Sequence, residues 1–151
     1  MTAQEMVVYF AGFFDGEGTV RLAKTYYNRR ASGGRTTYHK LHCSVTNSNK
    51  DILELYLDRF GGSVYERKGL PEHYKRIWIW TISTQKAFRF LEIIYPYLIE
   101  KKEQAMIVLE NEAIISNRTG YLLPEEVSQH RERVYQKLRE LKGQGYFAQE
   151  V

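Results

Sequence analysis

The sequence predicts a single domain of the α+β class with one antiparallel sheet. The chain has 151 residues, which is the length of one domain of ordinary size. Two regions in which apolar and polar residues alternate are typical of β-hairpins, and segments with helical periodicity precede, separate and follow them. Two hairpins with apolar undersides can join in one sheet that carries helices on one face. We therefore expect the other face of the sheet to be free and polar.

The first element is predicted to be a helix that is buried on several sides. Thr2 and Glu5 have the spacing of a capping box, and the nine residues from 6 to 14 form the longest apolar run of the chain. Gly12 costs a helix about 1 kcal/mol relative to Ala, so its presence indicates that another backbone comes close there. The helix is expected to end at Gly16 and Gly18.

Residues 19–22 and 41–45 are predicted to be the strands of the first hairpin. Val20 and Cys43 belong to an apolar face, since apolar residues also occur two positions away from them. Between the strands, residues 26–38 include three arginines and are predicted to form a long, basic tip. The opposite, polar face of the hairpin carries Arg21, Lys40, His42, Ser44 and Thr46.

The remaining elements follow the same kind of pattern. A helix capped by Ser48 or Asn49 is expected to end at Gly61, and residues 63–67 and 74–82 form the second hairpin. Its register stays open, because residues 77–80 are apolar on both faces. Three more helices are expected to span approximately residues 84–95, 97–115 and 124–141, with Pro96 between the first two.

Composition excludes several classes of protein. With 43% hydrophobic and 26% charged residues, the chain is neither disordered nor collagen-like. Cys43 is the only cysteine, which excludes an intrachain disulfide and zinc sites built on paired cysteines. The longest apolar run is too short to span a bilayer and lacks the features of a signal peptide. We expect an intracellular protein, cytoplasmic or organellar and not secreted, without a membrane partner.

Positive charge is concentrated in the two hairpins and the helix between them. Residues 19–86 carry thirteen basic and five acidic side chains, whereas the rest of the chain is slightly acidic. Such a stretch, interleaved with Tyr, His, Thr and Ser, favours a surface that binds a polyanion such as nucleic acid. A solvated surface without a partner is the alternative.

Two acids occupy an unusual place at the end of the first helix. A helix C-terminus carries partial negative charge, which disfavours carboxylates such as those of Asp15 and Glu17. A divalent cation would compensate, and carboxylates beside glycine carbonyls are suitable ligands for Mg²⁺. A glycine-rich turn with no ligand is the alternative interpretation.

The nine residues from Phe10 to Gly18, Phe-Ala-Gly-Phe-Phe-Asp-Gly-Glu-Gly, resemble the motif that names the LAGLIDADG homing endonucleases. The order of elements is also similar to that family's αββαββα core, with its saddle-shaped antiparallel sheet, helices on one face and extra C-terminal helices. The resemblance implies one endonuclease domain over residues 1–151, with a core of about 1–116 and a C-terminal extension of about 117–151.

This resemblance implies a site-specific, double-strand DNA homing endonuclease that serves intron or intein mobility. Its reaction would be metal-dependent phosphodiester hydrolysis that leaves 3′ overhangs. The chain has one copy of the motif, which in this family implies a homodimer on a long, near-palindromic site. The motif helices would pack against each other through Phe10, Ala11, Gly12 and Phe13.

The resemblance also implies roles for individual residues. Glu17 would bind the metal, with the carbonyl of Gly16 beside it, while Asp15, also a catalytic candidate, would have a more structural role. The metal would be Mg²⁺, with Mn²⁺ or Ca²⁺ able to substitute in binding. Asn47 matches a position that orders solvent around the metal, or else only starts the next helix. Lys101 matches a lysine of the cleavage pocket, with Lys102 as its neighbour.

The polar faces of the hairpins would read DNA in the major groove. Arg21, Lys40, His42 and Ser44 are the first candidates for base contacts. Arg29, Arg30 and Arg35 at the tip would hold phosphates or distant base edges. The second hairpin adds Arg67, Lys68, Lys75 and Arg76.

Two other functions remain open at this stage. One is a splicing maturase that binds intron RNA, which a basic sheet with retained acids also fits. The other is a noncatalytic DNA-binding regulator of the same fold, for which Glu17 would have no use. The four histidines lack the spacing of a metal site.

Overall fold

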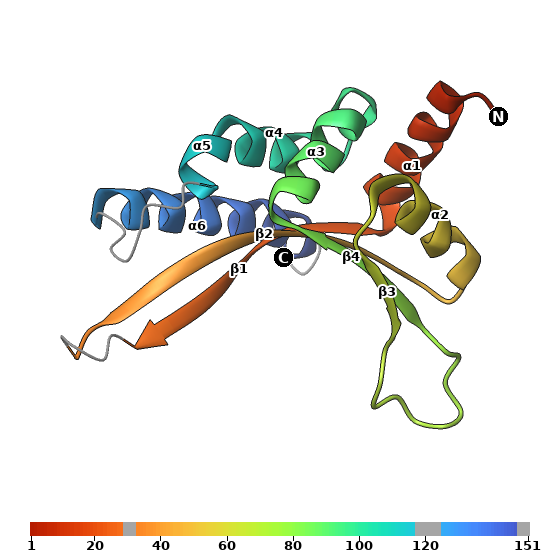
Figure 1. The fold of residues 1–151 in the computed structure, drawn as a ribbon, viewed down its shortest axis with the longest axis horizontal. Coiled ribbons are helices and arrows are strands. Elements are labelled where there is room, and N and C mark those ends of the chain that lie inside the picture. Colours follow the sequence, from red (N-terminus) through yellow and green to blue (C-terminus); the bar gives the residue numbers. More distant parts are fainter. Residues whose placement is uncertain (29–32, 117–124, 148–151) are drawn as a thin grey trace.

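The protein is a four-stranded antiparallel sheet with all its helices on one face, as predicted (Figure 1). The computed structural model describes residues 1–28, 33–116 and 125–147, without the side chains of residues 27, 28, 35, 36 and 143–147. The strand order is β1-β2-β4-β3, so the two hairpins join through β2 and β4. Within the described residues, the helices are too short or too polar to cross a membrane. The elements are α1 (Ala3–Glu17), β1 (Gly18–Asn28), β2 (Arg35–Asn47), α2 (Lys50–Phe60), β3 (Ser63–Glu66), β4 (Trp78–Ser83), α3 (Thr84–Ile94), η1 (Tyr95–Tyr97), α4 (Lys102–Glu110), α5 (Glu112–Ile115) and α6 (Glu125–Phe147).

The first hairpin is much longer than the sequence pattern predicted. β1 pairs with β2 without interruption from Gly18, opposite Val45, to Asn28, opposite Arg35. Most of residues 26–38, predicted to be the tip, are therefore strand. The Thr and Tyr residues that fill this stretch favour extended backbone, which explains why the ladder continues.

The second hairpin is shorter than predicted, and its register is now defined. β4 begins at Trp78 rather than at residue 74, and Val64 of β3 lies opposite Trp80. Trp80 is fully buried on the helix-covered face, where its indole Nε1 donates a 2.8 Å hydrogen bond to the carbonyl of Gly61. The alternation of side chains then places Ile79 on the open face.

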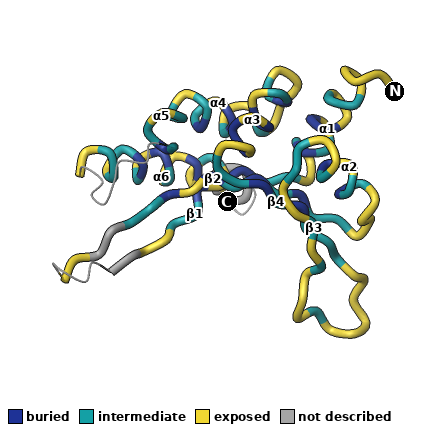
Figure 2. The backbone as a smooth tube through the Cα atoms, viewed as in Figure 1, coloured by how far each residue is buried: buried dark blue, intermediate teal, exposed yellow. Residues whose placement is uncertain are grey.

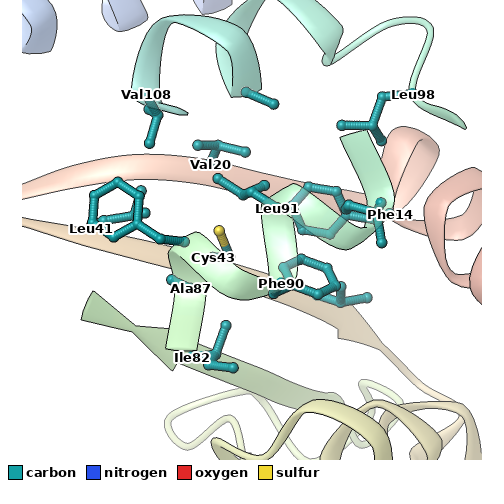
Figure 3. Packing of buried hydrophobic residues seen from close by; sticks show 14 of the residues in the cluster. Phe14, Val20, Leu41, Cys43, Ile82, Ala87, Phe90, Leu91, Leu98 and Val108 are labelled. Carbon is teal, nitrogen blue, oxygen red and sulfur yellow. The ribbon is translucent and has the colours of Figure 1, made fainter. Parts of the chain in front are cut away.

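The core lies between the sheet and the helices above it. Apolar residues of β1 and β2 point towards α3 and α4, and Figure 3 shows Val20, Leu41 and Cys43 gathered with Leu91 and Val108 in this cluster. Burial is continuous along the centre of the sheet and fades towards the ends of both hairpins (Figure 2). The predicted apolar faces of the first hairpin are thus confirmed.

Thr2 caps α1 as the sequence predicted. Its side chain accepts the N–H of Glu5 at 3.1 Å, and its own N–H is donated to the Glu5 carboxylate at 2.7 Å. The helix buries Phe10, Ala11 and Phe14 in the core and ends at Glu17. Its motif therefore lies where the helix layer meets the end of the sheet.

The predicted helix over residues 97–115 is confirmed only in its later part, where α4 and α5 end at Ile115 as predicted. A turn follows η1, and α4 begins only at Lys102. The physical reason is that the N–H groups of residues 99–101 are donated to a side chain from α1, described below, instead of starting a helix. A second break occurs at Asn111, whose side-chain amide binds the carbonyl of Ile107 at 2.7 Å.

Candidate functional site

The site begins at the abrupt change from α1 to β1. The N–H of Gly18 is donated to the carbonyl of Phe14, and the strand starts at this same glycine. A Cβ on Gly18 would lie 2.3 Å from the Phe14 ring, so only glycine fits. This close approach holds Asp15 and Glu17 at one end of the β1–β2 ladder.

Asp15 joins α1 to the turn before α4. Its carboxylate accepts hydrogen bonds from three backbone N–H groups, those of Ile99 at 3.0 Å, Glu100 at 2.9 Å and Lys101 at 2.8 Å. Burial alone would raise the pKa of Asp15, but the hydrogen bonds and the charge of Lys101 lower it below its usual value. The arrangement accounts for Asp15 as a structural brace, and a catalytic role for it stays a prediction.

Lys101 lies beside the motif, as the sequence predicted for it. Its Nζ donates a 2.5 Å hydrogen bond to the backbone carbonyl of Asp15. A cation at a helix C-terminus is favourable, so Lys101 supplies part of the charge compensation that the two acids need. Lys102, the neighbouring alternative, lies instead over the ring of Tyr95, 5.3 Å from its centroid.

Glu17 is the acid that remains available for a ligand. It is exposed, and within the described residues its carboxylate makes no hydrogen bond or ion pair. The described residues also contain no group of three or more His, Cys, Asp or Glu that could hold a metal ion. A single carboxylate beside a glycine carbonyl still fits Mg²⁺, which keeps several waters and commonly binds one or two carboxylates and substrate phosphates.

Asn47 lies at the same end of the sheet, but its side chain is engaged in starting α2. Its Oδ1 accepts the N–H of Asn49 at 2.8 Å, and Asn49 in turn caps α2 by accepting the N–H of Asp51. The pairing of Gly18 with Val45 puts Asn47 only two residues beyond the first rung of the ladder. Its role in ordering solvent stays a prediction.

The two faces of α1 differ in what they leave accessible. Phe10 and Ala11 are completely buried inside the chain, so the prediction that they contact a second copy is wrong. Phe10 packs against Tyr56, whose hydroxyl donates a 2.6 Å hydrogen bond to the Phe10 carbonyl. Gly12 is exposed, a Cβ built on it would meet nothing within 4 Å, and Phe13 is half-buried.

The open face of the sheet carries the predicted basic residues of the first hairpin. Arg21 pairs with His42, and both point away from the core because Val20 and Cys43 point into it. Lys40 and Ser44 share this face by alternation. Burial, followed by the charges of Arg21 and Lys40, lowers the pKa of His42, so this side chain is kept neutral between two cations.

The predicted DNA-binding residues of the second hairpin differ in whether their charge is already paired. Arg67, Lys68 and Lys75 are exposed around the loop that joins β3 to β4. Arg76 instead forms a bidentate ion pair with Glu66, with N–O distances of 2.8 and 2.9 Å, and stacks over Trp78. Arg29 and Arg30 lie outside the described residues, as does the side chain of Arg35.

One cation near the motif was missed by the sequence analysis. Lys142 of α6 has a pKa below its usual value, first because its ammonium is partly desolvated and then because Arg21 and Lys101 repel it. Lys142 of the C-terminal helix is therefore within electrostatic reach of both Arg21 and Lys101. No local pattern could identify it, since Lys142 lies 41 positions after Lys101 in the sequence.

Comparison with known sequences finds one distant relative. No family model matches the chain. The intron-encoded RNA maturase bI4 of Saccharomyces cerevisiae is 33% identical over 89 residues, which are 59% of this chain. The chain spans only 12% of that maturase's length.

Comparison with solved structures finds homing endonucleases. I-CvuI in complex with its target in the presence of Ca has a TM-score of 0.74 and 20% identity over 91% of this chain and 82% of its own. The archaeal intron-encoded endonuclease I-Vdi141I, complexed with DNA, has a TM-score of 0.75 and 19% identity over 93% of this chain and 86% of its own. I-TnaI has a TM-score of 0.62 and 17% identity over 91% and 96%. The shared feature at these identities is the fold.

Proposed function

We propose that this chain, which has the fold of the LAGLIDADG homing endonucleases, is a site-specific, metal-dependent endonuclease of double-stranded DNA. The observation that carries the proposal is the exposed Glu17 at the end of α1, two residues after the Asp15 whose carbonyl binds Lys101, where α1 meets the sheet with its open, basic face. That two of the neighbours were solved bound to DNA supports a DNA substrate.

Each residue of the site then has a defined task. Glu17 and the carbonyl of Gly16 would hold Mg²⁺, which supplies activation of water and stabilisation of charge on the attacked phosphoryl group. Lys101, oriented by its bond to the Asp15 carbonyl, would place a fixed positive charge near that group. Asp15 would keep Lys101 in place through the turn at residues 99–101.

We infer that the chain acts as a homodimer on a long, near-palindromic site. A single chain supplies one exposed motif carboxylate, whereas cutting two strands requires a site for each. The exposed side of α1, which includes Val8, Gly12 and Gly16, offers a narrow surface on which a second helix could approach closely. Two copies joined there would cut across the minor groove and leave 3′ overhangs.

A maturase that binds intron RNA is the second candidate. The 33% identity to the bI4 maturase over 89 residues favours it, and the basic open face would suit an RNA backbone as well.

The test is cleavage of a library of partly palindromic DNA duplexes by the purified protein, with Mg²⁺ or Ca²⁺, followed by sequencing of the ends. We expect Mg²⁺-dependent cuts with 3′ overhangs. Glu17→Gln should abolish cutting but keep DNA binding in Ca²⁺, because it removes one carboxylate charge and retains the shape of the side chain. Glu103→Gln, a substitution of an exposed acid on α4, is the matched control and should cut normally.

Each other outcome selects another function. Specific DNA capture without cutting in either metal would indicate a DNA-binding regulator. Capture of intron RNA but not of DNA would indicate a maturase. Full activity of Glu17→Gln would show that the cleavage site is not at the end of α1.

A further inference from the structure

The outer part of the long first hairpin diverges from the helices that cover the rest of the sheet. Figure 1 shows the outer part of β1 and β2 curving away from the helix layer, with α6 lying close to the hairpin nearer its root. We call residues 25–28 and 35–38 the arm, because they lie beyond the paired residues Lys24 and His39. Thr25 and Tyr26 of the arm are exposed.

A side chain of α6 bridges both strands at the root of the arm. The carboxylate of Glu132 accepts a hydrogen bond from Lys24 of β1 at 2.7 Å and contacts Nε2 of His39 on β2 at 3.0 Å. Lys24 and His39 are direct partners across the ladder, so one carboxylate holds one complete rung. The contacts are 93 and 108 positions apart in the sequence.

Neighbouring residues of α6 fix this carboxylate and the rung. Gln136, one turn further along the helix, donates a 2.9 Å hydrogen bond to Glu132. Tyr135 lies under the ammonium of Lys24, which is 4.2 Å from its ring centroid, and 5.8 Å from the ring of His39. His39 is buried and its Nδ1 has no partner among the described residues, so Nε2 to Glu132 is its polar contact.

The geometry of the arm makes its root mechanically important. Four residues of β1 lie beyond Lys24, a lever of about 14 Å at the usual rise of a strand. A tilt of about 10° at the rung would move the far end by about 2.5 Å, nearly the length of a hydrogen bond. Base contacts made by the arm would not survive such a shift.

We propose that Glu132 is a positioning residue that sets the angle of the arm against the DNA. It therefore controls discrimination at the outer base pairs of the target without touching them. The inference about base pairs rests on the proposed function, whereas the control of the arm's angle does not. Two experiments separate these parts.

The first experiment measures the arm without DNA. Spin labels on Gly34→Cys and Gln85→Cys, at exposed positions near the tip and on α3, report the distance between arm and body by pulsed electron resonance. Cys43 does not interfere, because it is buried and its pKa is raised. We expect a narrow distance distribution in the otherwise unchanged protein and a clearly broader one with Glu132→Ala.

Two further variants make this result interpretable. Glu140→Ala, on the same helix and without a hydrogen bond or ion pair in the described part of the chain, should leave the distribution narrow. Lys24→Met removes the ammonium of the 2.7 Å ion pair between Lys24 and Glu132 and should also broaden the distance distribution. This variant tests the proposal even if Glu132→Ala does not fold. An unchanged distribution in both Glu132→Ala and Lys24→Met would overturn the proposal.

The second experiment measures recognition. Binding of the native protein to duplexes substituted at single base pairs should show a penalty of about 5- to 150-fold at each recognised position. With Glu132→Ala we expect this penalty to fall at least about threefold at the outer positions, with the central positions and the cleavage rate at saturating DNA unchanged. A uniform loss at all positions would refute a positioning role. If the native protein bound no DNA, the proposed function would fail, and the spin-label distances would still decide whether Glu132 holds the arm.

Discussion

Asp15 and Glu17 are acids two residues apart in one helical turn, and the structure places them in opposite environments. Asp15 accepts three backbone N–H groups, while Glu17 is exposed at the edge of the open face. The two carboxylates therefore have different tasks: that of Asp15 stabilises the fold, and that of Glu17, as we propose, takes part in cleavage. The two tasks can be separated by mutation.

Asp15→Asn should destabilise the protein by about 1–3 kcal/mol, because an amide has one acceptor oxygen for three donors and places its NH₂ against an N–H. Urea unfolding measures this change. Glu17→Gln, at an exposed residue, should stay within about 0.5 kcal/mol of the native protein in the same experiment. Equal stability of the Asp15→Asn variant would contradict the bracing role.

The protein should lose stability as the solution is acidified, through the titration of His39 and Glu132. Burial lowers the pKa of His39 below its usual 6.5, so the unfolded chain takes up this proton first and stability falls as the pH drops below about 6.5. Burial of Glu132 opposes its ionisation, but hydrogen bonds from Lys24, Gln136 and His39 lower its pKa from 4.5 to about 2, which adds a further loss below about pH 4.5.

His39→Gln should reduce, but not abolish, the slope of the stability curve between about pH 6.5 and 4.5, since glutamine does not titrate and His42, whose pKa is also lowered, still contributes. Urea midpoints at a series of pH values would show the change. His73→Gln, at an exposed histidine, should leave the slope as it is in the native protein. A native curve that is flat from pH 7 to 5 would contradict the predicted linkage.

At this scale the sequence predicts what is local. The motif singled out Asp15 and Glu17, and a separate resemblance in the segment around residue 101 singled out Lys101. The bond between Asp15 and the turn at residues 99–101 was not predictable, since 84 positions separate Asp15 from Ile99 and nothing in either segment encodes the encounter. Lys142 was missed for the same reason.

Among the elements, α1 shows how one helix can serve two surfaces. Phe10, Ala11 and Phe14 are buried in the chain's own core, whereas Gly12 and Gly16 face outward with open space around them. Glycine inside a helix is unfavourable for the folded chain alone. Its presence on the exposed side supports the proposed contact with a second copy.

Gly12→Ala should stabilise the isolated chain by about 0.5–1 kcal/mol through helix propensity. Gly12→Leu should keep the fold but weaken self-association, because the side chain would hold a second helix away. Thermal unfolding and sedimentation velocity measure the two effects.

Gly18→Ala is the informative contrast, since its Cβ would collide with Phe14. We expect it to destabilise the chain by about 1–3 kcal/mol. If Gly12→Leu associated as strongly as the native protein, the dimer would have to use another surface.

The elements also differ in how far their own residues determine them. The N-terminus of α1 and the helix cap at Asn49 were predictable, because capping depends on residues within one turn. The length of the first hairpin was not, since a continuous ladder depends on pairing between strands as well as on the residues of each. The start of the helix expected over residues 97–115 was wrong, because a contact from α1 overrides the local helical propensity of residues 99–101.

The whole molecule has one hydrophobic core that includes the C-terminal helix. Val134 and Leu138 of α6 belong to the same buried cluster as the residues of the sheet. Arg131, also buried, donates a 2.8 Å hydrogen bond to the carbonyl of Ile114. The helix is therefore integrated with the rest of the fold rather than appended to it.

Truncation after Ser116 should remove most of the stability of the protein. Losing the burial of Val134 and Leu138 alone costs about 1.5–3 kcal/mol for each side chain, out of a typical total of about 5–15 kcal/mol. Circular dichroism during heating should show a broad or absent transition. A cooperative transition at the native temperature would show that α6 is dispensable for folding.

Trp78 and Trp80 are two positions apart on the helix-covered side of β4, yet they would emit light differently. Trp80 is fully buried in the core, and its indole N–H is hydrogen-bonded to the carbonyl of Gly61. Its fluorescence would therefore change only when the chain unfolds. Trp78 is half-buried beside Lys50 and Arg76, 4.6 and 5.1 Å from its ring centroid. A polyanion that drew these cations away would alter its emission. The chain thus contains two built-in optical probes, one for unfolding and one for ligand binding, that need no label.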